Sequence, residues 1–559
     1  MLQPEMDSVS EEKPSPIIIK EGKAEILFST QNEVFYNKVQ EFNRDLTVTA
    51  LNCFHDYLHS TDVKVLKYAK RLAWEAKNKD NDAEGSPMNT ESPDMTASST
   101  ESAPIPPLKI LEALGASGLR SIRFAKEIPG AGKITCNDLT PAALEAMERN
   151  FSHNNVTITK NCEDACMLMQ RSKNEYDAID LDPYGSPTIF LDTAVGAVRS
   201  GGVLCVTATD LGVLTGNHIQ ACYGKYGGMP MKRPYCHEFA LRLLLSCVDS
   251  HANRHGRYIK PLLSYKADFY IRVFVQVFQS QKEVQRTSLR RSYVYDCVGC
   301  HSYHLQPVGR AIEGTNKITP GRGPPVGQQC GECGKEFYIG GPIWSDPIHD
   351  LSFVQHMLDR VQGEESYLGT VKRIRGTLSV ILEELTDSPL FYELSFLSKT
   401  VHSPCPPTAV FRSAILNSGY KVSFSHVAEK SIKTDAPPSV IWDIMRAWAV
   451  ESKVKVREEG TVGGDIMRKE STHTVSFALH PDAVASSQKQ ALVRYAPNPE
   501  PEWGPKARAG KRKTLTKDKA NPCKKPSQDL KMFECRRHER GECELGENCK
   551  YTHKDSVAT

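Results

Sequence analysis

Short apolar runs alternate with segments of helical periodicity between residues 108 and 210. The apolar runs have the length of strands, and the intervening segments repeat apolar residues every three to four positions, as amphipathic helices do. Strands that alternate with helices form parallel β-α-β units, so the pattern predicts an α/β fold with an open, doubly wound sheet. In chain order the segments are LKILEAL, SIRFAKEI, KITCNDL, AALEAMERNF, YDAIDLD, IFLDTAVGAV and GGVLCVTATD.

The 559-residue chain is too long for one hydrophobic core, so we expect several folded parts. A first domain spans residues 20–255 and contains an insertion at 77–107. The insertion has almost no large apolar residue, so it cannot bury enough surface to become ordered. A second, mixed α+β domain spans 256–485 and includes the strand-like run KADFYIRVFVQVF. A basic linker at 486–530 and a compact Cys/His tail at 531–556 follow.

The distribution of charge and the number of cysteines indicate what the protein binds. The net charge is only +3, but residues 504–531 hold ten Lys or Arg against two Asp, which indicates a partner that carries phosphates. This segment fits a nuclear import signal or a phosphate contact, and a solubilising linker is the alternative. The 17 cysteines of such a long chain indicate metal ligation rather than disulfides.

The first residues have neither signal-peptide nor transit-peptide character, and no run of eighteen apolar residues occurs. We therefore expect no membrane association and a nuclear protein, with the mitochondrion or the cytoplasm as alternatives.

Three predicted strands end in residues that suit a nucleotide-like ligand, because ligands of doubly wound sheets lie beyond the carboxyl ends of the strands. The first ends in Glu112 and a turn that contains Gly115, where the backbone can approach a ligand. The second ends in Asp138, which can accept both hydroxyls of a ribose, and the third in Asp164-Ala165, which can hold an adenine edge. A tight turn without a ligand and two ordinary helix caps are the alternatives.

The fourth strand ends in Asp182-Pro183-Tyr184, the sharpest signal in the chain. An exocyclic amine on a nucleobase is a weak nucleophile because its lone pair is delocalised into the ring. The carboxylate of Asp182 and the carbonyl of Pro183 can accept hydrogen bonds from such an amine and aim its lone pair at a sulfonium methyl group. Asp182 can also take the released proton, and Tyr184 can stack on the extruded base. An Asp- and Pro-rich turn without chemistry is the alternative.

Two groups of cysteine and histidine have the spacing of zinc ligands. Paired C-x2-C knuckles predict a structural site with four thiolates, and redox-active dithiols are the alternative. In the tail, a C-x7-C-x5-C-x3-H pattern resembles CCCH zinc fingers, which commonly bind single-stranded RNA, and a purely structural finger is the alternative. The predicted ligands are Cys297, Cys300, Cys330, Cys333, Cys535, Cys543, Cys549 and His553.

The strand-end residues resemble those of class I S-adenosylmethionine-dependent methyltransferases. Asp182-Pro183-Tyr184 is similar to the Asp/Asn-Pro-Pro-aromatic motif of amino methyltransferases, with the second Pro missing. Over roughly residues 24–448 the chain resembles the tRNA (guanine-26-N2)-dimethyltransferase family. The further motifs that carry this resemblance are FY at 35–36, FNRD at 42–45, GLRSIRF at 118–124, VTATD at 206–210 and TDAP at 434–437.

The resemblance implies a Rossmann-like sheet, S-adenosyl-L-methionine as methyl donor, and transfer of two methyl groups to N2 of guanine 26 in tRNA. It also implies cofactor contacts at Arg44, Arg120, Asp138, Asp164 and Ala165, with Asp182 catalytic. Strand logic alone does not single out Arg44, and a surface Arg beside an N-terminal element is the alternative.

Both zinc ions are assigned to structure and RNA contact, because the transfer needs no metal. The partner is tRNA, and the oligomeric state is open, with a monomer expected. An adenine-N6 methyltransferase and a noncatalytic RNA-binding scaffold are the competing functions.

Overall fold

The computed structural model describes residues 17–28, 36–58, 107–363 and 367–496. They all belong to one compact unit. In these ranges no helix is long and apolar enough to cross a membrane. The predicted basic linker from residue 497 on, the Cys/His tail and all but one residue of the 77–107 insertion lie outside the described residues.

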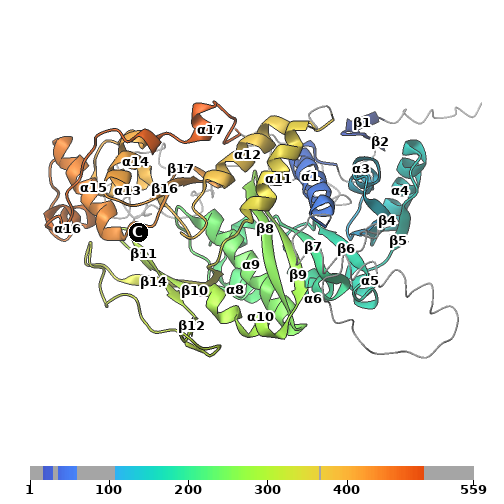
Figure 1. Cartoon of the computed structure of the whole chain (residues 1–559), viewed down its shortest axis with the longest axis horizontal. Coiled ribbons are helices and arrows are strands. Elements are labelled where there is room, and N and C mark those ends of the chain that lie inside the picture. The colour runs from blue at the N-terminus through green and yellow to red at the C-terminus, as the bar shows by residue number, and fades with distance from the viewer. Residues whose placement is uncertain (1–16, 29–35, 59–106, 364–366, 497–559) are drawn as a thin grey trace, which may run out of the picture. The chain divides into compact units, whose positions relative to one another are not determined.

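A seven-stranded sheet forms the centre of the first domain (Figure 1). Its order is β5-β4-β3-β6-β7-β9-β8; the first five of these strands are parallel to one another, and β9 is antiparallel to both of its neighbours. This confirms the predicted doubly wound α/β fold. The strands are β3 (Leu108–Glu112), β4 (Ala131–Asp138), β5 (Thr159–Cys162), β6 (Tyr176–Leu181), β7 (Val198–Ala208), β8 (Arg257–Ala267) and β9 (Tyr270–Gln279).

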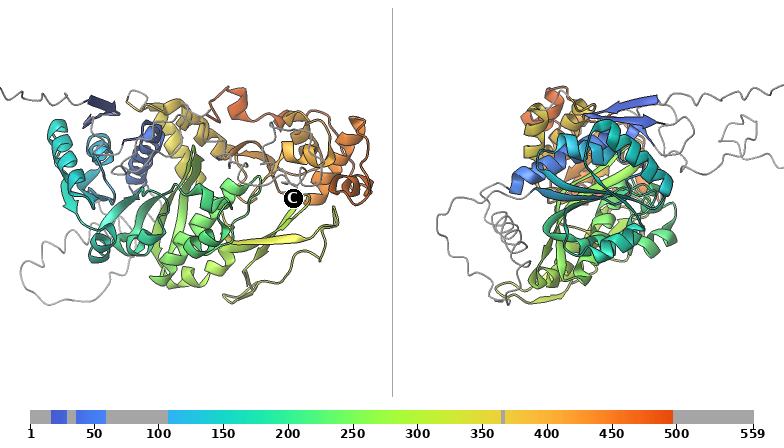
Figure 2. Two further views of the ribbon diagram at one scale, coloured as in Figure 1. Left: turned by 180° about the vertical axis from the view of Figure 1, so that it is seen from behind. Right: turned by 90° about the vertical axis from the view of Figure 1, so that its right-hand side faces the viewer.

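Helices cover both faces of this sheet (Figure 2). Consecutive residues of β3 point to opposite faces of the sheet. Ile110 packs into the core on one face and Leu111 into the core on the other. The first core is shared with α1 (Glu41–Leu58), α3 (Leu119–Glu127) and α4 (Pro141–Asn154), and the second with α5 (Ala165–Arg171), α6 (Thr188–Ala197) and α9 (Cys236–Arg254). Both faces are therefore apolar, as expected for parallel strands between two helical layers.

The strands β8 and β9 correct the domain boundary that the sequence predicts after residue 255. They pair with β7 and complete the first sheet, so the first domain continues to Gln279. The residues around Phe274 are buried on both faces of the strand, which suits a strand inside a sheet, but periodicity does not say which sheet it joins.

Beyond Gln279 the chain is mixed α+β, as predicted. A sheet with the order β11-β10-β14 contains β10 (Arg291–Cys297), β11 (Tyr303–Pro307) and β14 (Phe337–Trp344). A second sheet, β15-β17-β16, contains β15 (Tyr392–Glu393), β16 (Val422–Ser425) and β17 (Ala428–Thr434). The larger helices are α11 (Leu351–Gly363), α12 (Val371–Glu383), α13 (Leu394–Val401), α14 (Thr408–Asn417) and α15 (Pro438–Glu451).

Helices α11 and α12 join the two parts of the molecule. Phe353 of α11 and Ile374 of α12 lie in the same core as α1 and α3, so the second part packs on the first through a shared apolar interior. An N-terminal hairpin, β1 (Ile17–Glu21) and β2 (Ala24–Phe28), contacts α3 and α4. The remaining short elements are η1 (Lys38–Gln40), α7 (Leu211–Leu214), α8 (Ile219–Tyr226), α10 (Gln281–Gln285), η2 (Thr287–Arg290), β12 (Gly309–Ala311), β13 (Ile318–Pro320), α16 (Val462–Arg468), η3 (Pro481–Ala483) and α17 (Ser486–Lys489).

Candidate active site and zinc site

The residues predicted at the strand ends meet at one edge of the sheet. Glu112, the last residue of β3, lies in register with Asp180 of β6, and Asp138 of β4 lies in register with Cys162 of β5. Between β3 and β6 the strand order reverses, and such a switch point leaves a crevice at the carboxyl ends of the strands. The edge that carries the predicted ligands is therefore the one where this topology places a binding site.

Glu112 is buried beneath this crevice. Its Oε2 accepts hydrogen bonds from the backbone N of Ser121 at 3.0 Å and from the Ser121 hydroxyl at 2.5 Å, in the first turn of α3. Burial raises its pKa to about 7, although Arg120 nearby opposes the shift. The structure thus gives Glu112 a supporting contact to α3, and the predicted cofactor contact stays a prediction.

Gly115 and Gly118 are both required by close packing in the turn between β3 and α3. A Cβ on Gly115 would lie 2.3 Å from Sγ of Cys136. Gly118 has φ of +75°, and a Cβ there would lie 2.5 Å from the ring of Phe151. The glycines hold the turn tight whether or not a ligand is bound.

Asp164 makes the helix-cap contacts that were the alternative interpretation, whereas Asp138 binds backbone in the turns before α3 and α4 and the N-cap of α4 is Thr140. Oδ1 of Asp138 accepts from the backbone N of Thr140 at 3.0 Å, and its Oδ2 accepts from the backbone N of Ala116 at 3.0 Å. Asp164 caps α5, with its Oδ1 accepting from the backbone N of Cys166 at 2.8 Å. These contacts fix both carboxylates in place. Oδ1 of Asp138 also accepts from the Thr140 hydroxyl at 2.9 Å and Oδ1 of Asp164 from the backbone N of Met167 at 3.1 Å, so Oδ2 is the oxygen of each that keeps acceptor capacity.

The surface next to these carboxylates fits a nucleoside. Leu139, Met167 and Ile189 follow the ends of β4, β5 and β6, and they are 61, 62 and 71 % exposed. Buried Ala165 precedes Met167 at the start of α5. Apolar side chains this exposed at three successive strand ends can cover the faces of an adenine, while Asp138 is placed for a ribose. The residues present therefore fit an adenosine-containing cofactor.

Asp182 lies directly after β6 and is held by two side chains. Its Oδ2 accepts from Nη2 of Arg120, with which it also forms an ion pair, and from Nδ2 of Asn43 at 3.2 Å. The Asp182 side chain is 20 % exposed, Pro183 is buried, and Tyr184 is 44 % exposed. A fixed carboxylate thus stands beside an aromatic ring that reaches the surface.

A buried charge network surrounds Arg120, the residue that pairs with Asp182. Arg272 of β9 pairs with Asp180 and donates to the hydroxyls of Thr47, at 3.0 Å, and Thr207. Nε of Arg120 lies 3.2 Å from Oδ2 of the same Asp180. Sequence reasoning assigned no role to Arg272 or Asn43; the available signal was a lone Arg inside an apolar strand, which must find a buried partner.

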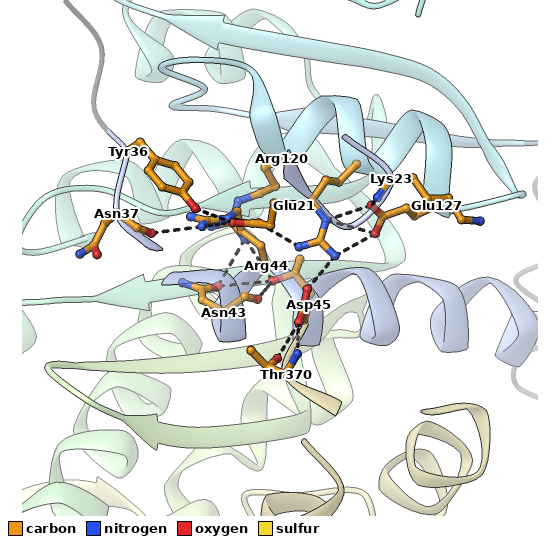
Figure 3. Close-up of polar contacts among 12 residues, drawn as sticks. Glu21, Lys23, Tyr36, Asn37, Asn43, Arg44, Asp45, Arg120, Glu127 and Thr370 are labelled. Carbon is orange, nitrogen blue, oxygen red and sulfur yellow. Dashed lines mark hydrogen bonds and ion pairs between the residues drawn. The ribbon is translucent and has the colours of Figure 1, made fainter. Parts of the chain in front are cut away.

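Arg44 lies in a different environment from the strand ends. Its guanidinium binds both oxygens of Glu21 at 2.5 Å, donates to the carbonyl of Asn37 at 3.1 Å, and stacks on Tyr36 (Figure 3). Burial alone would raise the pKa of Glu21, but the adjacent Arg charges outweigh it and lower the pKa. These contacts join α1 to the N-terminal hairpin; none of them is to a predicted strand-end residue.

Arg123 extends this network toward the second part of the chain. It pairs with Glu21 at 2.9 Å, with Asp45 at 2.7 Å and with Glu127 at 2.9 Å. The other oxygen of Asp45 accepts from the backbone N of Thr370 at 2.9 Å and from its hydroxyl at 2.6 Å, just before α12. One turn of α1 therefore contacts the hairpin, Asp182 at the carboxyl edge of the sheet, and Thr370 at the start of α12.

The four cysteines of the paired knuckles converge in the second part of the chain. Their Sγ atoms all lie within 4.8 Å of one another, with Cys297 3.3 Å from Cys333 and Cys300 3.6 Å from Cys330. At a Zn–S distance of about 2.3 Å, a tetrahedron has sulfur–sulfur edges of about 3.8 Å, so the cluster fits zinc.

Backbone amides also support this assignment. Gly299 N donates to Sγ of Cys297 and Glu332 N to Sγ of Cys330, both at 3.4 Å, as thiolate ligands require. The cluster is buried among apolar residues of the second part, which suits a structural role. The four predicted ligands of the tail, from Cys535 to His553, lie outside the described residues.

Known proteins share this sequence and architecture. A family model described as N2,N2-dimethylguanosine tRNA methyltransferase matches residues 15–446. The chain is 43 % identical to the tRNA (guanine(26)-N(2))-dimethyltransferase of Mus musculus, over 98 % of this chain and 88 % of that protein. It is 36 % identical to the tRNA (guanine(26)-N(2))-dimethyltransferase, mitochondrial, of Saccharomyces cerevisiae, over 88 % of this chain and 92 % of that protein.

A solved structure agrees with these sequence matches. Trm1 from Pyrococcus horikoshii, in complex with S-adenosyl-L-methionine, is 28 % identical, with a TM-score of 0.59, and the match covers 77 % of this chain and 99 % of that one. The family model spans most of the first domain and much of the second. The chain therefore belongs to the N2,N2-dimethylguanosine tRNA methyltransferase family.

Proposed function

We propose that this protein transfers methyl groups from S-adenosyl-L-methionine to N2 of guanine 26 in tRNA, forming N2-methylguanosine and N2,N2-dimethylguanosine. The observation that carries the proposal is the carboxylate of Asp182, fixed at the end of β6 by Arg120 and Asn43 beside the half-exposed Tyr184. The family and its named relatives support guanine N2 rather than adenine N6 as the acceptor.

The cofactor would be held along the strand ends. Asp138 would bind the ribose hydroxyls, and Asp164 with the backbone of Ala165 would bind the adenine edge, in the crevice next to the turn at Gly115. Arg120 would act mainly through Asp182, because its guanidinium faces the carboxylates of Asp180, Asp182 and Glu112. Cofactor contact by Arg44 remains a prediction from the family resemblance.

The protein groups around Asp182 account for the activation of the amine. S-adenosyl-L-methionine supplies an electrophilic methyl group on a sulfonium centre. Asp182 and the carbonyl of Pro183 accept hydrogen bonds from the guanine amino group, which draws the lone pair out of the ring and aims it. Tyr184 stacks on the extruded base. As N2 becomes positively charged, Asp182 stabilises the charge and accepts the proton that N2 loses.

The second domain, after Gln279, would hold the tRNA body, with the Cys297, Cys300, Cys330 and Cys333 site keeping its fold intact when zinc is bound. The tail finger and the basic linker would add contacts to RNA. We propose a monomeric enzyme that works in the nucleus; the mitochondrial name of the yeast relative makes the mitochondrion the second location to test.

The test is mass spectrometry of nucleosides in tRNA from cells that lack the protein, complemented by the wild type or by Asp182→Asn. We expect dimethylguanosine to disappear without the protein and to return only with the wild type. Unchanged dimethylguanosine in the deletion would favour the noncatalytic scaffold, and loss of an N6-methyladenine instead would favour the adenine enzyme.

A further inference from the structure

The two oxygens of the Asp182 carboxylate have different surroundings. Arg120 and Asn43 both donate to Oδ2, while Oδ1 accepts no hydrogen bond from any described residue. The side chain is 20 % exposed, and Oδ1 is the oxygen whose acceptor sites no described residue occupies. The protein thus uses one oxygen to hold the carboxylate and keeps the other for the substrate.

The amide of Asn43 is itself fixed in one orientation. Its Nδ2 donates to Oε1 of Gln40 at 2.7 Å as well as to Asp182, and its Oδ1 accepts from Nη1 of Arg120 at 3.3 Å. A flipped amide would place N–H groups against the guanidinium and a carbonyl against the carboxylate. The network therefore requires the donor to point at Asp182.

We infer that Asn43 is a positioning residue for methyl transfer: together with Arg120 it pins Oδ2 of Asp182, so that Oδ1 is the acceptor for the N2–H of guanine. The inference rests on the proposed catalytic role of Asp182 and adds a residue that is fully buried and comes from α1, far from the strand ends in sequence.

The two successive transfers depend differently on this arrangement. Guanine N2 carries two hydrogens before the first transfer, and Oδ1 of Asp182 and the carbonyl of Pro183 can each accept one. In each transfer the N2–C bond forms and the C–S bond breaks, with its electron pair left on sulfur. N2 gives its proton to Oδ1 of Asp182, which then passes that proton to water. Monomethylated N2 keeps a single hydrogen, so the second transfer relies on one acceptor, which we assign to Oδ1.

The experiment compares full-length wild type, Asn43→Leu and Asn43→Asp in single-turnover reactions on a tRNA transcript. Both replacements are close to Asn in size and remove the donor to Asp182. We expect the first transfer to slow by about ten-fold, the worth of one hydrogen bond to a charged group, and the second by more. Monomethylguanosine should therefore accumulate. The dissociation constant for S-adenosyl-L-methionine, measured by calorimetry, should stay within about two-fold of the wild-type value.

Asn52→Ala is the matched control. Asn52 is a buried Asn on the same helix, and its Nδ2 donates at 2.9 Å to the carbonyl of Glu127 rather than to the active site. We expect this variant to lose thermal stability but to keep the wild-type ratio of monomethyl to dimethyl product.

The outcomes separate the inference from the proposed function. If Asn43→Asp, which can still accept from Arg120, shows wild-type rates and product ratio, the positioning role is refuted. The same holds if both Asn43 variants match Asn52→Ala in product ratio. If Asp182→Asn retains wild-type turnover, the catalytic assignment itself fails, whatever the Asn43 variants do.

Discussion

Arg272→Met tests whether the charge network beneath Asp182 is required for both folding and catalysis. The Arg272 and Asp180 side chains are 0 and 2 % exposed, and the two form an ion pair. Met keeps much of the side-chain length but removes the charge. Asp180 then stays buried, and its remaining cation is Arg120, which also pairs with Asp182.

The expected magnitude follows from burial and distance. At an effective dielectric constant of about 20, opposite charges about 3 Å apart, as in the ion pair of Arg272 and Asp180, attract by about 5 kcal/mol. Removing one partner of a buried pair costs about 3–5 kcal/mol, because the other charge stays desolvated. Arg120 should also move toward Asp180 and bind Asp182 less well. We therefore expect a melting temperature about 5–10 °C lower, with a lower rate of methyl transfer.

The assay is thermal and urea unfolding of Arg272→Met, Asp180→Asn and the double variant. The double variant should be more stable than Arg272→Met alone, because it no longer buries an unpaired charge. Lys133→Met is the control: it removes an exposed pair with Glu175 and should change the free energy of unfolding by less than about 1 kcal/mol. A wild-type midpoint for Arg272→Met, or no recovery in the double variant, would refute the reasoning.

Three further predictions concern catalysis, zinc and pH. Asp182→Asn should lower the rate of methyl transfer by about 100-fold or more while cofactor and tRNA affinities, measured by calorimetry and filter binding, are largely kept; a wild-type rate would contradict the mechanism. Cys300→Ser should remove one zinc equivalent per chain by elemental analysis and destabilise the second domain; unchanged zinc and melting would contradict the four-thiolate site. Burial holds the pKa of His349 well below its usual range. The unfolded chain therefore takes up a proton below about pH 6.5 that the folded protein does not. Wild type should lose about 1 kcal/mol of unfolding free energy relative to His349→Asn between pH 6.5 and 5.5 in urea titrations. A difference that is constant with pH would show that His349 titrates normally.

Local sequence patterns were sufficient to predict the sheet and its ligand-bearing edge. Alternation of short apolar runs with helical segments predicts β-α-β units, and parallel strands place their carboxyl ends together. Glu112, Asp138 and Asp182 could therefore be located at one edge without a structure. Likewise, the spacing of Cys297 and Cys300, repeated at Cys330, predicts a four-thiolate site from the chemistry of the ligands alone.

The contacts around Asp182 could not be predicted in this way. Asn43 lies 139 positions from Asp182 in the chain, and Arg272 lies 92 positions from Asp180. Which strand is adjacent to β7 decides where Arg272 points, and strand order depends on long-range packing that no local pattern encodes. For the same reason the first domain runs through β8 and β9, beyond the boundary that composition indicated.

The sequence by itself determined the fold class, the family and the residue types at the carboxyl edge of the sheet, because periodicity, spacing and short motifs are local properties of the chain. Only the tertiary structure decided that Arg120 and Asn43 both bind Oδ2 of Asp182, and that one turn of α1 contacts both Asp182 and Thr370. These are matters of orientation between distant segments. They follow from the burial of charges that must each find a partner once water is excluded.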